Sequence, residues 1–276
     1  MPEMQWATGQ DDSTINPGRP ICRTKVSFFL VIISIVMIGS STVLAGDEFP
    51  FSEGEKLTYE LKWGIVPAGE ASLEVLSNEI IDGVEGRHFR MTTRTNSFVD
   101  VFYKVRDVVD GFTDLTVNRS LLYKKNQNEG STKRDIVVAF DWEEKTAQYS
   151  NFGEFNQPIS INEGSFDPFS VIYYCRLFDF ESNENIVRPV TDGKKIVTGV
   201  AKFKGRKSIR VNGIRYDTFL IEPEIEHISG VFKKSKKAKI QIWLTADDRR
   251  IPVRIKSKVV VGSFVADLVE KPVTDR

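Results

Sequence analysis

The chain has 276 residues, and its 38 basic and 38 acidic side chains give a formal net charge of zero. A general nucleic-acid-binding protein normally carries a basic excess, so this balance argues against that class. With 41% hydrophobic and 28% charged residues, the chain is expected to fold around a packed core, and its length allows one or two domains. Two cysteines and two histidines leave little material for zinc sites, disulfide frameworks or Cys/His catalysis.

The N-terminal region has the pattern of a secretory signal peptide preceded by a polar extension, residues 1–22. Arg23 and Lys25 form a basic flank, and residues 26–38 are apolar apart from two serines. Small residues follow and lead to Ala45. These three parts predict export to the periplasm, with cleavage near Ala45.

An uncleaved membrane anchor is the alternative, because residues 26–45 are long enough to span a bilayer. The small and polar residues 39–42 dilute that stretch and favour cleavage. Asp47 lies where a lipoprotein signal needs a cysteine, so no lipid anchor is expected. Residues 46–276 are therefore predicted to form a single soluble, mainly β exported domain. Cys175 is its one cysteine, which excludes an intramolecular disulfide.

Most of this domain has the period-two alternation of apolar and polar residues that is typical of strands with one buried face. Residues 56–63 show it most clearly, and Asn212-Gly213 is a strong hairpin signal between two alternating runs. No run of alternating strands and long helices favours a parallel sheet. The predicted strands cover residues 56–63, 71–75, 88–95, 101–109, 120–125, 134–142, 146–150, 195–200, 202–211, 214–221, 239–244, 252–261 and 264–268.

One segment has helical periodicity instead. Asp167 is a capping residue, Pro168 suits a first helical turn, and apolar residues then recur at helical spacing, which predicts a helix over 168–180. The fold class expected is mainly β: a curved antiparallel sheet or partly open β-barrel packed on one central α-helix. Two packed half-domains that share the helix are the alternative.

The chain offers few candidates for catalysis. It has no glycine-rich phosphate loop and no G-x-S-x-G elbow. His88 and His227 are far apart in sequence, Cys175 belongs to the predicted helix, and Asp247 and Asp248 are expected to end a strand in a turn. We therefore predict no catalytic residue, no metal site and no cofactor.

Charge is patterned along the second half of the chain. A run of lysines lies opposite three glutamates that alternate along one strand face, Glu222, Glu224 and Glu226. A solvated hairpin tip with cross-strand ion pairs explains this pattern. The alternative is peripheral contact with an anionic membrane surface or an acidic partner. The residues for that contact are Lys233, Lys234, Lys236 and Lys237.

Aromatic residues concentrate in or beside the predicted strands. Their default role is to fill the core, but in a curved sheet they can also line an apolar cavity. The candidate ligand-binding residues are Tyr59, Trp63, Phe102, Phe169 and Tyr173.

Three segments together resemble a known family. They are WGIVPAGEA at residues 63–71, DPFSVIYYCR at 167–176 and IWLTADDRRIPV at 242–253. In this order the chain resembles the exported bacterial family called domain of unknown function 3108. The resemblance implies export and a mainly antiparallel β fold, and it supplies no activity. We interpret the following motif residues as structural: Gly69, Asp167, Arg176, Trp243, Asp248, Arg250 and Pro252. Among them, Arg176 is expected to reach a carboxylate.

Three functions remain open from the sequence. The first is a soluble periplasmic binding or carrier protein for an apolar ligand such as a lipid or acyl chain, by analogy with half-open barrels of that compartment. The second is an envelope assembly or adaptor protein that has a filled core and an envelope protein as its partner. The third is an enzyme that acts on envelope polymers.

Overall fold

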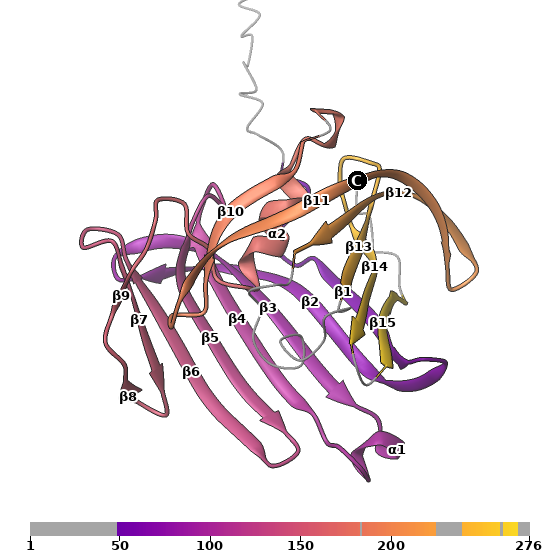
Figure 1. Cartoon of the computed structure of the whole chain (residues 1–276), viewed down its shortest axis with the longest axis horizontal. Coiled ribbons are helices and arrows are strands. Elements are labelled where there is room, and N and C mark those ends of the chain that lie inside the picture. Colours follow the sequence, from indigo (N-terminus) through magenta and orange to yellow (C-terminus); the bar gives the residue numbers. More distant parts are fainter. Residues whose placement is uncertain (1–48, 183, 225–238, 260–261, 270–276) are drawn as a thin grey trace, which may run out of the picture. The chain divides into compact units, whose positions relative to one another are not determined.

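A computed structural model describes residues 49–182, 184–224, 239–259 and 262–269 (Figure 1). These residues belong to the compact unit Asp47–Arg276. The predicted signal peptide and the polar extension lie outside the described residues. None of the helices in the described part is long and apolar enough to cross a membrane.

The described unit is mainly β, as predicted, and its strands form one antiparallel sheet. Most strands pair with their neighbours in the chain, and β15 pairs with β1, which joins the two ends of the domain. The strands are β1 Lys56–Trp63, β2 Val66–Ile81, β3 Val84–Thr95, β4 Arg106–Asp114, β5 Ser120–Glu129, β6 Thr132–Asp141, β7 Thr146–Asn151, β8 Glu154–Phe155, β9 Ile159–Ser160, β10 Ile186–Thr191, β11 Ile196–Val211, β12 Ile214–Pro223, β13 Lys239–Thr245, β14 Pro252–Val259 and β15 Gly262–Leu268.

The sheet is not closed into a barrel. Its path of hydrogen-bonded neighbours begins at β10 and ends at β8, with β9 paired to β7. The edge of β10 is joined instead by the segment before α2, Ser170–Leu177, because Phe166 N–H donates to the carbonyl of Pro189 at 2.9 Å. The predicted antiparallel, partly open arrangement is therefore confirmed.

The helices differ from the prediction. The Asp167 carboxylate does accept the N–H groups of Phe169 and Ser170, each at 2.8 Å, but α2 runs only from Ser170 to Leu177. Phe178 is extended, and the Asp179 carboxylate then accepts the N–H of Glu181 and starts a separate 3-10 turn, η1 Phe180–Ser182. An aspartate that bonds its own backbone in this way competes with continuation of the helix.

A short helix, α1 Ser97–Asp100, lies between the strands predicted over 88–95 and 101–109, and the second of these begins later than predicted. Residues 101–105 do not join the sheet as a strand, and β4 begins at Arg106. The cause is local: the Asn96 side chain accepts the N–H of Val99 at 3.0 Å and so caps a helical turn.

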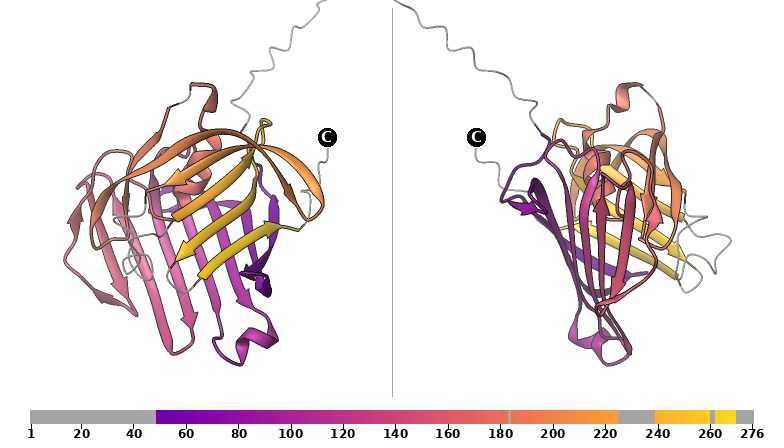
Figure 2. Two further views of the ribbon diagram at one scale, coloured as in Figure 1. Left: turned by 45° about the vertical axis from the view of Figure 1, so that its right-hand side comes forward. Right: turned by 90° about the vertical axis from the view of Figure 1, so that its left-hand side faces the viewer.

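Two apolar clusters form the core, and α2 contributes residues to both. Figures 1 and 2 show α2 beside the strands of the sheet. Tyr173 stacks on Phe89 with ring centres 3.8 Å apart in the first cluster, while Cys175 belongs to the second with Phe180 and Phe219. Each fully buried aromatic side chain contributes about 1.5–3 kcal/mol through the apolar surface it removes from water. Residues of α2 therefore pack with core residues of the sheet in both clusters.

Candidate functional site

The five predicted ligand-binding residues do not come together in the structure. Tyr59, Phe169 and Tyr173 are buried in the first apolar cluster, where their rings pack against other core side chains. Trp63 and Phe102 lie on the surface, with 51% and 77% of their areas exposed. The three buried rings fill the core. Trp63 and Phe102 are therefore the two candidate residues that a ligand can reach from the surface.

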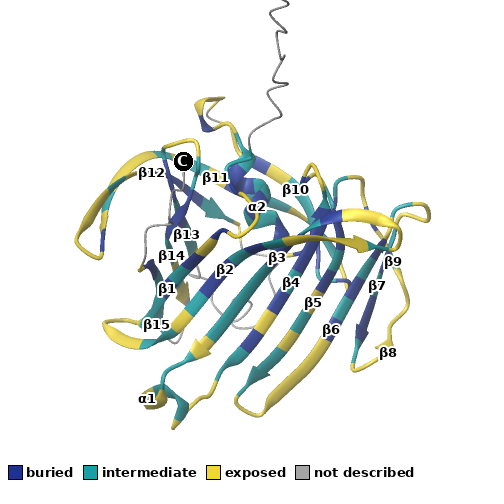
Figure 3. Cartoon of the chain, turned by 180° about the vertical axis from the view of Figure 1, so that it is seen from behind, coloured by how far each residue is buried: buried dark blue, intermediate teal, exposed yellow. Residues whose placement is uncertain are grey.

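All exposed aromatic side chains of the described residues lie at one end of the sheet. This end comprises the β1–β2 and β7–β8 turns, the start of β15, and α1 with the residues after it. It is the end that carries the label α1 in Figure 3. We call this set the aromatic rim. It consists of Trp63, Phe98, Phe102, Tyr103, Phe152, Phe155 and Phe264.

Backbone hydrogen bonds join the segments of the aromatic rim in sequence around the end of the sheet. Gly64 N–H donates to the carbonyl of Ser263 at 2.8 Å, which couples the β1–β2 turn to the start of β15. Asn96 N–H donates to Ala68 at 2.9 Å and places α1 beside the start of β2. The two further links are Gly130 N–H to Lys104 at 2.8 Å and Phe152 N–H to Asp135 at 2.9 Å.

Two glycines let rings lie close to the turns of the rim. A Cβ atom on Gly262 would stand 2.6 Å from Trp63 Nε1, and one on Gly130 would stand 2.8 Å from the Tyr103 ring. Trp63 also stacks on Phe264, with ring centres 6.3 Å apart and an interplanar angle of 10°. The rings are thus held by packing against the turns while their outer surfaces face solvent.

Polar contacts fix α1 on the sheet. Arg106 donates to both carboxylate oxygens of Asp100, at 3.1 and 2.6 Å, and also to the carbonyl of Thr95 at 3.2 Å. Hydrogen bonds from Arg106 and Thr95 lower the pKa of Asp100. Asn96 Nδ2 donates to the carbonyl of Pro67 at 2.8 Å, so α1 is attached to both β2 and β4.

Two carboxylates, those of Asp107 and Glu129, lie next to the rim. Asp107 is buried, and its oxygen accepts the N–H of Asn128 at 2.8 Å. Burial, followed by a hydrogen bond with Glu129, raises the pKa of Asp107 to about 6. Lys125 Nζ lies 3.7 Å from Asp107 and 3.8 Å from Glu129, and it partly balances the pair.

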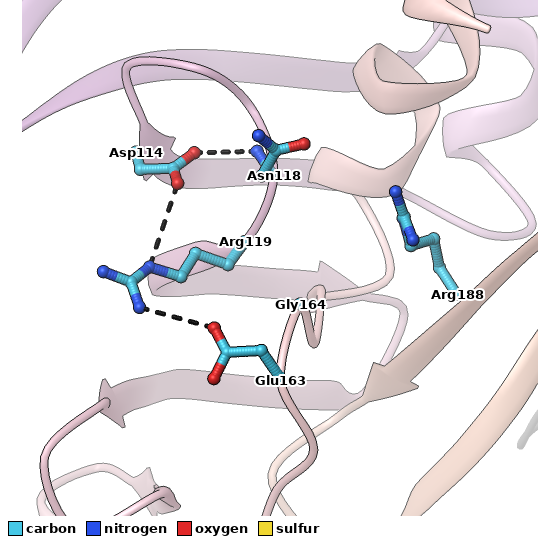
Figure 4. Close-up of a pocket in the computed structure, with 6 residues that line it drawn as sticks. All are labelled: Asp114, Asn118, Arg119, Glu163, Gly164 and Arg188. Atoms are coloured by element: carbon cyan, nitrogen blue, oxygen red, sulfur yellow. Dashed lines mark hydrogen bonds and ion pairs between the residues drawn. The ribbon is translucent and has the colours of Figure 1, made fainter.

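An open polar pocket of about 340 Å³ lies at the β4–β5 turn, the opposite end of the sheet (Figure 4). Arg119 is 3.8 Å from Asp114 and 3.7 Å from Glu163, and Asn118 N–H donates to Asp114 at 2.7 Å. Arg188 lies over the ring of Tyr174, at 4.2 Å from its centre. The charged side chains of this pocket therefore neutralise one another or engage an aromatic ring.

The family-motif residues take structural positions. A Cβ atom on Gly69 would meet the carbonyl oxygen of Arg94 at 2.1 Å, so β3 can approach β2 only at a glycine. Pro252 begins β14, and its carbonyl accepts the Tyr59 hydroxyl at 2.8 Å. Trp243 is half-buried on β13 opposite Arg254. Asp248 and Arg250 lie in the β13–β14 turn, as predicted for its aspartates.

Arg176 forms the centre of a buried polar network. Its side chain is 1% exposed, and it contacts both oxygens of Glu55 at 2.5 and 3.0 Å. It also donates to the carbonyls of Pro50 at 2.8 Å and Arg249 at 3.0 Å. The predicted carboxylate contact of Arg176 is present, and it ties α2 to the start of the domain and to the β13–β14 turn.

The histidine and cysteine side chains considered for catalysis or metal binding are buried where the structure describes them. His88 is buried between Glu79 and Asp110, at 2.8 and 2.7 Å. Burial raises the pKa of Cys175 to about 12, so this thiol is protonated at neutral pH. In the described part of the chain, no group of three or more His, Cys, Asp or Glu side chains is arranged to hold a metal ion. His227 lies outside the described residues.

The predicted lysine contact with a membrane falls on Lys233, Lys234, Lys236 and Lys237, all outside the described residues. The cross-strand ion pairs predicted beside them are present. Lys239 Nζ is 2.7 Å from Glu222, and Lys202 Nζ is 2.6 Å from Glu224.

Sequence reasoning missed five members of the rim as site residues: Phe98, Tyr103, Phe152, Phe155 and Phe264. A signal was available for Tyr103 and Phe152, because large rings in the connections between strands face solvent unless another element covers them. Their meeting at one end of the sheet depends on strand pairing, which the spacing of residues does not show.

Comparison with known proteins supports the fold. A solved structure, described as a beta-barrel-like protein of domain of unknown function DUF1849 from Brucella abortus, is similar with a TM-score of 0.54. It is 9% identical, and the similarity covers 80% of this chain and 98% of that chain. No curated protein matches. The sequence profile described as "Protein of unknown function (DUF3108)" matches residues 58–269, more than half of the chain. The chain therefore belongs to the DUF3108 family.

Proposed function

We propose that the protein is a non-catalytic binding or carrier protein of the bacterial periplasm, and that its ligand is an apolar envelope component such as a lipid or acyl chain. The observation that carries the proposal is the aromatic rim. Seven aromatic side chains are exposed at one end of the sheet, and two pairs of them are in contact with each other, which is the kind of surface that binds an apolar partner. The open antiparallel sheet and the likeness to a beta-barrel-like protein are consistent with a binding scaffold.

The proposed ligand contacts the rim rather than the aromatic core. Tyr59, Phe169 and Tyr173 already pack against protein, so displacing them would open the first apolar cluster. In this proposal α2 is the central support of the half-open barrel, because it supplies side chains to both clusters. Trp63 and Phe102 are then the members of the original candidate set that meet the ligand.

Native mass spectrometry after gentle purification tests the proposal. We expect lipid or fatty acid to co-purify with the wild-type protein and to fall several-fold in a Trp63→Ala/Phe102→Ala variant. Ile80→Ala/Val84→Ala is the matched control, because these exposed residues flank the β2–β3 turn at the opposite end of the sheet.

Two results would contradict the carrier function. One is a wild-type protein that neither co-purifies with lipid nor binds a fluorescent fatty acid. The other is equal lipid content in the rim variant and the control variant. A stably bound envelope protein in place of lipid would instead identify an assembly or adaptor protein.

A further inference from the structure

We propose that the aromatic rim docks on the surface of an anionic lipid bilayer, with its rings in the headgroup region. This inference uses the same surface as the proposed function, but it does not require a carried ligand. It rests on where the rings lie, on the charges beside them and on how the rim is anchored.

The composition of the rim suits a water–lipid boundary. Tryptophan, tyrosine and phenylalanine side chains favour that boundary, where an apolar ring can leave water beside polar groups. Aliphatic residues extend the same surface: Ile65 is 94% exposed at the β1–β2 turn, and Val101 is exposed just after α1. Phe98 and Phe102 contact each other with ring centres 5.9 Å apart, so they would enter the interface as one unit.

Unpaired basic residues flank the rings. The acidic residues nearest α1 are already neutralised, since Glu70 pairs with Arg94 and Asp100 pairs with Arg106. Five exposed basic side chains near the rim make no ion pair with the described residues: Lys104, Lys133, Arg134, Lys256 and Lys258.

The unpaired acidic residues of the same segments are fewer. They are Asp135 at the start of β6 and Glu154 in β8. The local excess of positive charge is complementary to anionic headgroups, at about 1 kcal/mol for each basic residue near such a surface. An acidic protein would also attract these lysines, but the exposed rings between them favour a medium that accepts apolar groups.

The arrangement of the turns allows simultaneous contact. Hydrogen bonds link consecutive turns of the rim, and the turns lie along one end of the sheet in two directions of view (Figures 1 and 2). Among the described residues, the opposite end carries the polar pocket and none of the exposed aromatic side chains. Among the described residues, exposed aromatic side chains are thus confined to one end of the sheet.

Vesicle sedimentation with the exported domain tests the inference. We expect binding to vesicles of phosphatidylcholine with phosphatidylglycerol, and binding at least ten-fold weaker to phosphatidylcholine alone. Phe98→Ala/Phe102→Ala should reduce binding to the anionic vesicles about ten-fold, and Ile80→Ala/Val84→Ala should leave it unchanged. Lys104→Gln/Lys133→Gln/Arg134→Gln should weaken binding several-fold and make it less sensitive to salt.

Fluorescence gives a position-specific readout. Trp63 emission should shift to the blue on anionic vesicles and should be quenched by brominated lipid, and a Trp63→Phe variant should lose that component. Folding of each variant is checked by circular dichroism. No binding of the folded wild-type domain to anionic vesicles would overturn the proposal, and so would equal binding of the rim and control variants.

The outcome is separable from that of the carrier function. Co-purified lipid without vesicle binding would refute docking and leave the carrier proposal standing. Vesicle binding without co-purified lipid would support docking alone. Self-association that depends on Phe98 and Phe102 and abolishes vesicle binding, measured by analytical ultracentrifugation, would make the rim a contact between copies and overturn docking.

Discussion

At the scale of single residues, burial decides what a charged group does. Arg176 and Glu55 are both buried, yet each is matched by charge and hydrogen bonds. The guanidinium of Arg176 also lies 5.0 Å from the centre of the Phe51 ring. A buried pair of this kind is costly to break, because removing one partner leaves the other charge uncompensated. The contacts of Arg176 thus give this residue of the family motif a structural role.

Asp107 makes a pH-dependent contribution to stability. Its folded pKa of about 6 lies above the value of about 3.9 expected for an unfolded chain. The folded state therefore keeps the proton longer, and the stabilisation is fully present below pH 4 and lost as the pH rises through 6.

We expect Asp107→Asn to gain stability relative to wild type between pH 4 and pH 7.5, by on the order of 2 kcal/mol. Urea denaturation at both pH values measures the difference. Asp135→Asn, at an exposed position at the start of β6, is the control and should show a much smaller change. An equal stability difference between Asp107→Asn and wild type at the two pH values would contradict the expectation.

At the scale of elements, side-chain contacts with the backbone set the boundaries. Period-two patterns located most strands, but hydrogen bonds between side chains and the backbone decided where several helices and turns begin. Asn96 caps α1 just before an expected strand, and Asp179 starts the separate turn η1 two residues after α2 ends. Thr245 similarly closes the turn between β13 and β14, because its hydroxyl accepts the N–H of Ile251 at 2.8 Å.

The Asn96 cap should hold α1 and the rim residues that follow it in their folded conformation. Replacing Asn96 with alanine removes the bonds to Val99 and Pro67, and loss of a helix cap costs about 1 kcal/mol. We expect faster amide hydrogen exchange across residues 97–103 in Asn96→Ala. Asn78→Ala, which removes an exposed contact with Glu85 on other strands, should leave that exchange unchanged. Unaltered exchange in Asn96→Ala would show that the cap does not hold α1.

At the scale of the whole molecule, one sheet and a shared helix link two clusters of core residues. β15 pairs with β1, so the ends of the domain are joined, and α2 carries Tyr173 in one cluster and Cys175 in the other. The alternative of two half-domains that share a helix predicts separable units. The continuous path of strand pairing favours a single cooperative unit instead.

Equilibrium unfolding distinguishes these two descriptions. We expect one transition in urea, with tryptophan fluorescence and far-ultraviolet circular dichroism coinciding. Phe89→Leu in the first cluster and Phe180→Leu in the second should each lower the free energy of unfolding by about 1–3 kcal/mol. Each substitution should move both signals together. A variant that shifts one signal alone would show that the clusters unfold separately.

The sequence by itself determined the fold class, the family and most strands, because alternation is a local property that each strand carries in its own residues. It also located Asp167, whose carboxylate accepts two N–H groups at the start of α2, and it predicted a carboxylate partner for Arg176. Only the tertiary structure decided which aromatic side chains fill the core and which face solvent. Tyr59 and Trp63 belong to the same alternating set of apolar residues on one strand, yet Tyr59 is buried and Trp63 is exposed. The rim gathers residues as far apart as Trp63 and Phe264, and long-range strand pairing alone brings them together.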